Sequence, residues 1–285
     1  MRVTVIGAAN VDILTKSADK IIHADSNPAV VNLSAGGVGL NIAVNLSRLG
    51  AEIDFVTAIG ADPLGAFLRE SCESSGINTS AWIVREGLST GLYSAAHDYD
   101  GELYVGFNAM AVLESVEACD VALFGEQIRK ADLLIVDANL TVEAIETILA
   151  ERGDRPVMAD TVSVAKAPRL GGLLPKIGIL KLNRAEAQRL TGLAVDSDED
   201  LKLACADLTS RGAGRVFITL GAQGVCAADS RGAVFVPAVP VAVNNVTGAG
   251  DAFAAGVAFR YNEDLETQAK YGAALAAQHL DRRIK

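Results

Sequence analysis

The chain has 285 residues, half of them hydrophobic, and its 25 basic and 35 acidic side chains give a net charge of −10. A chain of this size can bury a large core. The acidic balance argues against a nucleic-acid partner and against an anionic membrane surface, since both favour basic patches. No apolar run is long enough to span a bilayer, and the N-terminal MRVTVIGAANVDIL is typical of a first strand and not of a signal peptide. We therefore expect a cytoplasmic protein.

Strand-like and helical runs alternate along most of the chain. The predicted strands are Val3–Gly7, Ile53–Gly60, Asp132–Asp137, Pro156–Asp160, Ile177–Asn183 and Arg215–Gly221, and the predicted helices are Gly39–Leu49, Leu64–Cys72 and Val142–Glu151. This alternation predicts an α/β fold with a mainly parallel central sheet and helices on both faces. The ligand crevice of such a sheet lies beyond the carboxyl ends of its strands. The residues at or just past those ends are Asn10, Asp137, Asp160, Asn183 and Gly221.

Two segments break this alternation. Residues 26–34 and 82–108 are strand-like without intervening helices, and the second contains a hairpin that turns at Asp100-Gly101. We expect a small separate β-sheet whose strands are inserted into the main domain at about 14–34 and 82–108. A sheet of this kind over an α/β crevice can act as a lid that excludes water during a transfer reaction. A decorative or dimer-forming sheet is the alternative, and it remains compatible with a lid.

Several common functional motifs are absent or out of context. Gly87–Gly91 reads GLSTG, but a strand-like run follows it where a nucleophile elbow needs a helix. The chain has no GxGxxG and no Gly-Lys pair, which argues against a dinucleotide-binding oxidoreductase and against a Walker-A P-loop. The four cysteines and three histidines lack metal-ligand spacing, so we expect no zinc site and mostly buried, reduced thiols.

Glycine clusters next to polar residues remain to be explained. In VNNVTGAGDAFAAG, Gly248 and Gly250 directly precede Asp251 and an apolar helix. Asp251 could be only a helix N-cap. The alternative is an anion site, because glycine lets the backbone N–H groups at a helix N-terminus approach a ligand closely. Three further clusters, SAGGVGLNIA, NRAE and TLGAQG, lie at comparable junctions, and all four together are hard to assign to turns alone.

These motifs resemble those of the PfkB (ribokinase-like) family of carbohydrate and nucleoside kinases, over essentially the whole chain. The resemblance rests on GAANVDI, GGVGLNIAVNLSRLG, NRAE, TLGAQG and TGAGD. It implies a ribokinase-like three-layer α/β sandwich with a small β-sheet lid, formed by residues 1–285 as a single domain. Within the family, ADSNPAVVNLSAGGVGLNIAVNL and NNVTGAGDA look most like pseudouridine kinases. That likeness implies ATP-dependent transfer of the γ-phosphate to a ribosyl 5′-hydroxyl group.

The resemblance also implies a catalytic role for the last motif. Asp251 would be the general base, which takes the proton from the substrate hydroxyl as its oxygen attacks the γ-phosphate of ATP. The N–H groups of Gly248, Ala249 and Gly250 would form an anion hole for the transferring phosphoryl group. ATP and Mg²⁺ are the implied cofactors, and helix dipoles and the metal ion would carry the positive charge.

Binding roles are implied for a second set of residues. On the substrate side they are Asn10, Asp12, Gly36, Gly37, Asn41, Asn108 and Lys166, with Asn108 in the lid as a reader of the base. On the nucleotide side they are Asn183, Thr219, Gly221, Gly224 and Thr247, and Glu186 with Asn183 would organise Mg²⁺ through water. For Asp12, Asn183 and Glu186 the alternative is helix capping or solvent exposure. Lys166 could equally be an exposed surface lysine.

Three departures from the family's motifs bear on function. Leu40 stands where pseudouridine kinases usually carry arginine, so recognition of base or phosphate is expected to differ there. Asn245 replaces an acidic residue that helps relatives hold potassium, so the sequence does not support dependence on a monovalent cation. The chain also ends about a helix short of the family's usual length, which predicts weaker nucleotide affinity.

Two alternatives to a pseudouridine kinase stay open. One is a kinase for another nucleoside or sugar, which Leu40 favours, and the other is a non-catalytic nucleoside-binding protein, which the short C-terminal region favours. The expected partners are a small-molecule nucleoside or sugar substrate and ATP, with no nucleic acid and no membrane. The exposed edges of the lid strands also offer an interface for a homodimer.

Overall fold

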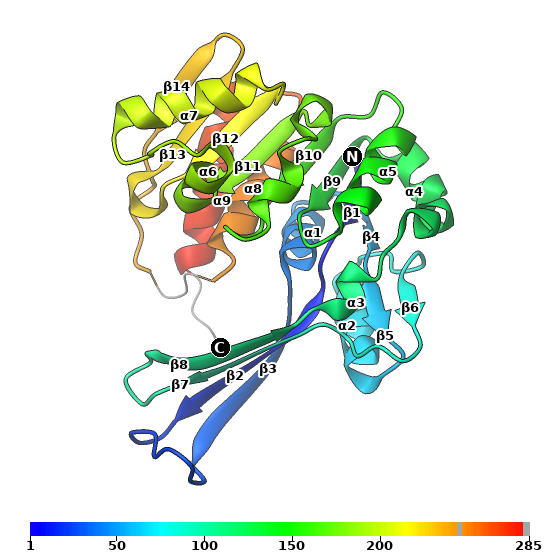
Figure 1. Cartoon of the computed structure of the whole chain (residues 1–285), viewed down its shortest axis with the longest axis vertical. Coiled ribbons are helices and arrows are strands. Elements are labelled where there is room, and N and C mark those ends of the chain that lie inside the picture. Colours follow the sequence, from blue (N-terminus) through cyan, green and yellow to red (C-terminus); the bar gives the residue numbers. More distant parts are fainter. Residues whose placement is uncertain (244–246, 282–285) are drawn as a thin grey trace.

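The computed structural model describes residues 1–243 and 247–281, and its main feature is an eight-stranded sheet (Figure 1). The strand order is β14-β13-β12-β11-β10-β9-β1-β4, in which the strands from β12 to β4 pair in parallel and β13 pairs antiparallel with both β12 and β14. The strands are β1 (Arg2–Ile6), β4 (Glu52–Val56), β9 (Leu133–Asp137), β10 (Val157–Asp160), β11 (Ile179–Asn183), β12 (Arg215–Thr219), β13 (Val225–Asp229) and β14 (Gly232–Val236). The mainly parallel sheet expected from the alternation is confirmed.

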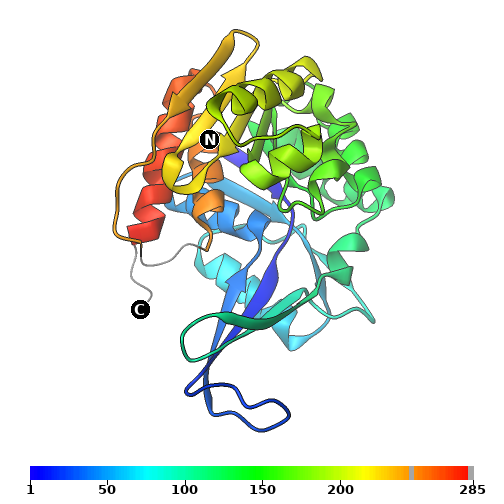
Figure 2. The same cartoon turned by 60° about the vertical axis from the view of Figure 1, so that its left-hand side comes forward.

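Helices cover both faces of this sheet, because successive strand residues such as Val5 and Ile6 enter different cores. One face packs on α1 (Val38–Arg48), α2 (Pro63–Ser74), α8 (Ala249–Phe259) and α9 (Leu265–Asp281) (Figure 2). The other packs on α4 (Gly125–Lys130), α5 (Val142–Glu151), α6 (Arg184–Thr191) and α7 (Asp198–Ser210), with α3 (Ala111–Glu114) and the 3₁₀ segments η1 (Ala118–Phe124), η2 (Ala167–Leu170) and η3 (Leu174–Lys176). The result is the three-layer sandwich that the family resemblance implied.

A second sheet of four strands projects from one end of the sandwich as a long ribbon (Figure 1). Its order is β3-β2-β7-β8, with β2 (Asn10–Ser17), β3 (Ala29–Gly36), β7 (Leu92–His97) and β8 (Leu103–Ala109). The predicted hairpin joins β7 to β8, and Gly101 adopts a left-handed φ of 91° in its turn. We call this sheet the lid. Its root is the end where β2 follows β1 and β3 leads into α1, at the pair Asn10 and Gly36.

The structure differs from the sequence prediction in two places. Residues 53–60 form two strands, because the chain leaves the main sheet at Thr57, and β5 (Ala58–Gly60) pairs instead with β6 (Ile83–Arg85). The run stays apolar throughout because both strands are buried, so hydrophobicity gives no sign of the break. The lid strands also begin at residue 10 and end at residue 109, and β6 lies outside the lid.

Three further observations concern the cysteines, the GLSTG segment and the helices. All four cysteines are free, and only Cys119 is exposed. Gly87–Gly91 lies between β6 and β7 and is not followed by a helix, so the match to a nucleophile elbow is accidental. No helix in residues 1–243 or 247–281 combines the length and hydrophobicity needed to cross a membrane.

Candidate active site

The start of α8 meets the start of α1 at the carboxyl end of the main sheet. Gly248 is the N-cap of α8 with a left-handed φ of 84°, a conformation that glycine adopts without strain, and Asp251 lies in the first turn. The side-chain amide of Asn41, in α1, donates a hydrogen bond of 2.8 Å to Oδ2 of Asp251. Two predicted site residues 210 positions apart therefore touch.

Asp251 is buried, with only 9% of the residue exposed. This burial raises the pKa of Asp251 to about 7; the positive charge of Lys181 opposes the increase, and the negative charge of Asp160 adds to it. A carboxyl group with a pKa near the working pH is suited to general base catalysis, because it can take up a proton and release it again.

A second carboxylate lies at the root of the lid. Asn10 donates to Oδ1 of Asp12 at 2.6 Å, and Gly36 pairs with Asn10 on the neighbouring strand. A Cβ atom on Gly36 would come within 2.2 Å of Oδ2 of Asp12, so only glycine leaves room for this carboxylate. Burial raises the pKa of Asp12. The arrangement presents a half-buried carboxylate that can accept hydrogen bonds from vicinal hydroxyl groups.

Asp137 connects the two segments that carry these residues. Its Oδ2 accepts from the N–H of Ala8 at 2.8 Å and from the N–H of Gly39 at 3.1 Å, and the residue is 1% exposed. The turn after β1 is thereby tied to the first turn of α1. Gly37 is equally confined, since a Cβ there would lie 2.5 Å from the carbonyl oxygen of Ala8. The sequence marked Asp137 as a strand-end residue but gave no sign of this role.

The lid contributes one row of side chains on the same face as Asp12. The strand register aligns Ser34, Asp12, Tyr93 and Asn108 as direct neighbours across β3, β2, β7 and β8. Side chains of directly paired residues share a face. Asn108 is therefore exposed on the face that carries Asp12, and Tyr93, which the sequence analysis did not single out, lies between them.

Asn183 and Glu186 form a capping box at the start of α6. The side chain of Asn183 accepts from the N–H of Glu186, and Oε2 of Glu186 accepts from the N–H of Asn183 at 2.8 Å. Thr161 donates a further hydrogen bond of 2.7 Å to the same oxygen. The helix-capping alternative is therefore observed.

The polar groups at this place fit Mg²⁺ held indirectly. Magnesium ions usually keep several waters and take only one or two carboxylates together with substrate phosphates. Among the described residues no group of three or more His, Cys, Asp or Glu side chains forms a metal cage. Buried Glu186 beside exposed Asn183 matches the indirect mode.

The predicted nucleotide-side residues lie along the next strand and at the start of α8. Thr219 pairs with Asn183 across β12 and β11. Gly221 and Gly224 both adopt left-handed φ values in the segment η4 (Gly221–Gln223) and its cap. Thr247 is exposed next to Gly248, and Asn245 lies outside the described residues.

Neither Lys166 nor Leu40 is an exposed surface residue. The ammonium group of Lys166 is half-buried and contacts Oδ1 of Asn139 at 2.5 Å, and burial lowers its pKa. The surface-lysine alternative is therefore not observed. Leu40 is 2% exposed and packs in the core, so this position presents no side chain to the crevice.

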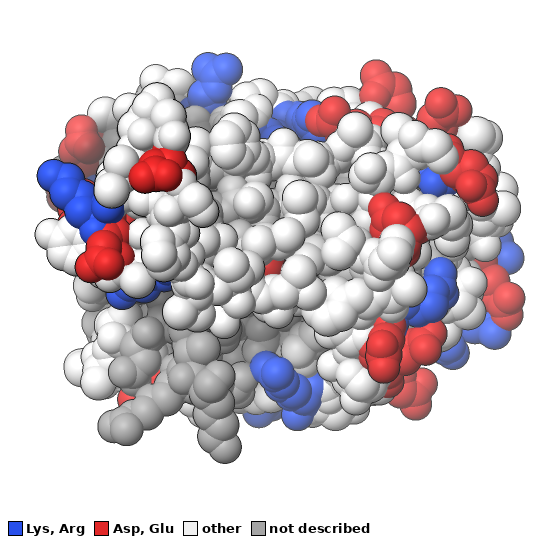
Figure 3. All heavy atoms as spheres, turned by 90° about the horizontal axis from the view of Figure 1, so that it is seen from below, with Lys and Arg blue, Asp and Glu red and all other residues white. Residues whose placement is uncertain are grey.

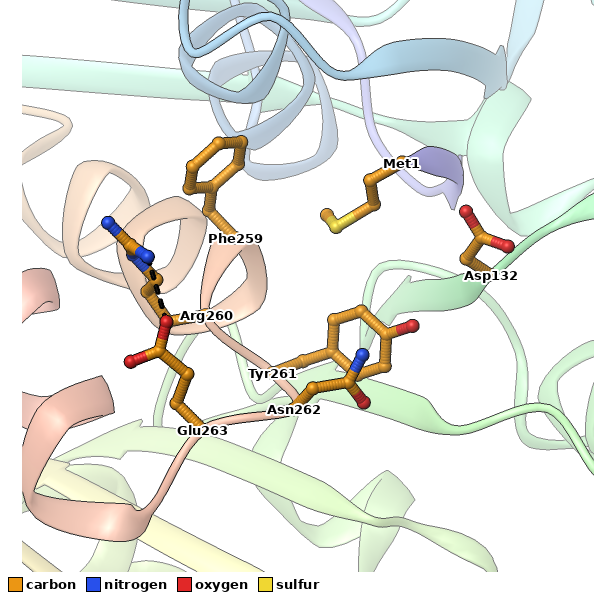
Figure 4. Close-up of a pocket in the computed structure, with 7 residues that line it drawn as sticks. All are labelled: Met1, Asp132, Phe259, Arg260, Tyr261, Asn262 and Glu263. Carbon is orange, nitrogen blue, oxygen red and sulfur yellow. Dashed lines mark hydrogen bonds and ion pairs between the residues drawn. The ribbon is translucent and has the colours of Figure 1, made fainter.

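A pocket of about 380 Å³ opens at the opposite end of the main sheet, where its parallel strands begin. Figure 4 shows its lining side chains spread around an open space at the amino ends of β1 and β9 and the C-terminal end of α8. Its lining is Met1, Asp132, Phe259, Arg260, Tyr261, Asn262 and Glu263. None of these residues belongs to the candidate site.

Comparison with known proteins places these features in a family context. The model of the pfkB family of carbohydrate kinases matches residues 1–283. Pseudouridine kinase of Escherichia coli K12 is 36% identical over 258 residues, covering 90% of this chain and 82% of that protein. A carbohydrate kinase structure from Agrobacterium tumefaciens shares 29% identity with a TM-score of 0.86, over 97% of this chain and 89% of that one. The structure of Arabidopsis thaliana ribokinase complexed with ribose and ATP shares the fold, with a TM-score of 0.84 at 22% identity, over 99% and 93% of the two chains.

Proposed function

Since the chain belongs to the pfkB family of carbohydrate kinases, we propose that it transfers the γ-phosphate of ATP to the 5′-hydroxyl group of pseudouridine. It is a phosphotransferase with an alcohol group as acceptor. The observation that carries the proposal is the contact between Asn41 and Asp251, because it joins the glycine block of α1 to a buried base at the start of α8.

The proposed reaction follows from where the charges and dipoles lie. Asp12 and Asn10 would hold the ribose hydroxyls at the root of the lid and so direct the 5′-hydroxyl group toward Asp251. Asp251 would take up the hydroxyl proton as the oxygen attacks phosphorus. The N–H groups of residues 248–250 would stabilise the charge on the transferring group, because they point out of the N-terminus of α8.

The nucleotide and metal ion would lie along β11 and β12. Thr219, Gly221, Gly224 and Thr247 would contact ATP, and Asn183 and Glu186 would hold Mg²⁺ through water, where the ion supplies positive charge to the phosphates. Asn108 would read the base from the lid, and half-buried Lys166 would contact substrate or phosphate. Residues 1–285 would act as one kinase unit, and two copies would pair through the lid.

A rate measurement tests the proposal. ADP release from ATP and Mg²⁺ should be rapid with pseudouridine and slow with uridine, ribose and fructose 6-phosphate. Preference for another of the four would keep the kinase mechanism and change the substrate. Folded protein inactive with all of them would favour the non-catalytic nucleoside-binding alternative.

A single substitution tests the assignment of the base. Asp251→Asn keeps the shape and the contact with Asn41 but removes the proton acceptor, so kcat should fall by at least about 10³-fold. Pseudouridine binding, measured by calorimetry, should change little. Turnover at the wild-type rate would contradict the role of Asp251.

A further inference from the structure

Lys181 is a charged residue in the interior that the proposed mechanism leaves unused. Among residues 1–243 and 247–281 it is the one basic residue that is buried, with 7% of its surface exposed. Lysine is almost never buried without a partner. Its ammonium nitrogen lies 2.9 Å from Oδ2 of Asp160, on the neighbouring strand β10. The two side chains therefore form a buried ion pair.

The position of the ammonium group is as informative as its burial. A Cβ atom on Gly250 would lie 3.2 Å from Nζ of Lys181, so the charge rests against the first turn of α8. That turn carries Asp251 and the N–H groups of the proposed anion hole. Glycine at position 250 is what allows this approach, since any side chain there would meet the ammonium group.

The surroundings of Lys181 are acidic. The negative charges of Asp160, Asp251 and Glu186, from β10, α8 and α6, all act on its ammonium group. One ammonium group therefore faces three carboxyl groups. The positive charge of Lys181 therefore interacts with Asp251 as well as with Asp160.

We propose that Lys181 is a positioning residue that holds a fixed positive charge beneath the first turn of α8, where it stabilises negative charge on Asp251 and attracts the transferring phosphoryl group into the anion hole. This inference rests on the proposed phosphotransfer function. It assigns to a buried strand residue the kind of charge that a P-loop lysine supplies in other nucleotide-binding folds. Interactions between charges are strongest where water is excluded, so one buried cation at this place has a large effect.

The competing explanation is purely structural: Lys181 would only neutralise Asp160. Two variants separate the two explanations. Lys181→Met leaves Asp160 buried and unpaired, which should lower the melting temperature. Asp160→Asn/Lys181→Met removes both charges, so most of the stability should return. Lys181→Arg tests whether a cation of another shape suffices, and Lys130→Met, at an exposed position, is the matched control.

The measurements are melting temperature, kcat, KM for ATP and the pH profile of kcat. In the double variant we expect stability near wild type and kcat still about 10–100-fold low. The acidic limb of the profile should lie at higher pH than in the wild type but shift less than in Lys181→Met, because loss of the Asp160 charge offsets part of the loss of the cation. The pH at which this limb falls depends on the groups that act on Asp251, namely Lys181, Asp160, Asp137 and Asn41. Lys130→Met should match the wild type in all four quantities.

The test separates failure of the role proposed for Lys181 from failure of the proposed kinase function. A double variant with wild-type kcat and pH profile would overturn the role of Lys181 and leave the kinase intact. A wild type that prefers ribose or uridine would change the substrate but not this test, since the ratio of variant to wild type is what counts. If no acceptor reacts, calorimetry with ATP and Mg²⁺ decides: unchanged ATP affinity in the double variant, or no ATP binding by the wild type, would overturn the proposal.

Discussion

The ionisation of one buried carboxyl group, that of Asp251, should make the reaction rate depend on pH. The pKa of Asp251 is raised to about 7, so the group loses its proton as the pH rises through neutrality. A general base works only when ionised, so kcat should be full above about pH 8 and fall by about tenfold per unit well below pH 7. A profile of kcat between pH 5 and 9 tests this. A flat profile down to pH 5 would show that Asp251 is ionised throughout, or that it is not the base.

The absence of a side chain at Gly36 leaves room for Asp12, the second carboxylate of the site. Gly36→Ala would place a methyl group 2.2 Å from the present position of Oδ2 of Asp12, so the carboxylate must move away from the ribose side. KM for the nucleoside should rise by about tenfold or more, a loss typical of a hydrogen bond to a charged group, while KM for ATP changes little. Steady-state kinetics give both constants.

A control glycine makes this experiment specific. Gly172→Ala adds the same methyl group where no atom lies within 4 Å, and its φ is not left-handed. It should leave both KM values unchanged. Equal effects in the two variants, or an unchanged nucleoside KM in Gly36→Ala, would argue against Asp12 as the ribose contact.

At the scale of elements, helix α9 contacts Thr247, the residue directly before the anion hole. Nε2 of His279 lies 2.7 Å from the carbonyl oxygen of Thr247, so this nitrogen must carry the hydrogen and donate it. The imidazole ring also lies 3.2 Å from where a Cβ on Gly248 would be. Through this contact, the last turns of α9 restrain the left-handed turn that begins α8.

Removal of this contact should affect nucleotide binding more than stability. In His279→Ala the turn loses one restraint, so we expect KM for ATP to rise about three- to tenfold while the melting temperature shifts by less than about 3 °C. Gln278→Ala, at the exposed neighbouring position, is the control. An unchanged KM for ATP in His279→Ala would mean that the turn holds its shape without α9.

The elements also show what a sequence can and cannot reveal. Long buried strands and glycine-opened helices were predicted within a few residues, because burial on both faces and helix starts leave local patterns. The split at Thr57 left no such pattern. Neither did the roles of Asp137 and Lys181, which depend on contacts across the sheet between residues distant in sequence. Motif likeness identified Asn41 and Asp251, but only the fold shows that they touch.

At the scale of the whole molecule, the lid presents an apolar outer face. Register alternation puts Val31, Leu33, Val105 and Phe107 on the face opposite Asp12 and Asn108, and Phe107 is 67% exposed. Seen from the lid end, the molecule carries few charged groups across its middle, and most lie toward the edges (Figure 3). Exposed apolar side chains grouped on one face of a sheet favour an interaction site, and the free edges of β3 and β8 add unpaired backbone groups.

A second copy of the chain is the partner that we propose for this face. Phe107→Glu would place a charge at its most exposed apolar position, so the variant should run as a monomer in light scattering at concentrations where the wild type is a dimer. Leu123→Glu is the matched control, because Leu123 is 69% exposed on η1, outside the lid, and should leave the dimer intact. Dimeric Phe107→Glu, or a wild type that stays monomeric at every concentration, would contradict pairing through the lid. Because Phe107 directly precedes Asn108 on the same strand, a dimer formed here would also hold the proposed base reader in place, so kcat/KM for the nucleoside should fall together with dimerisation.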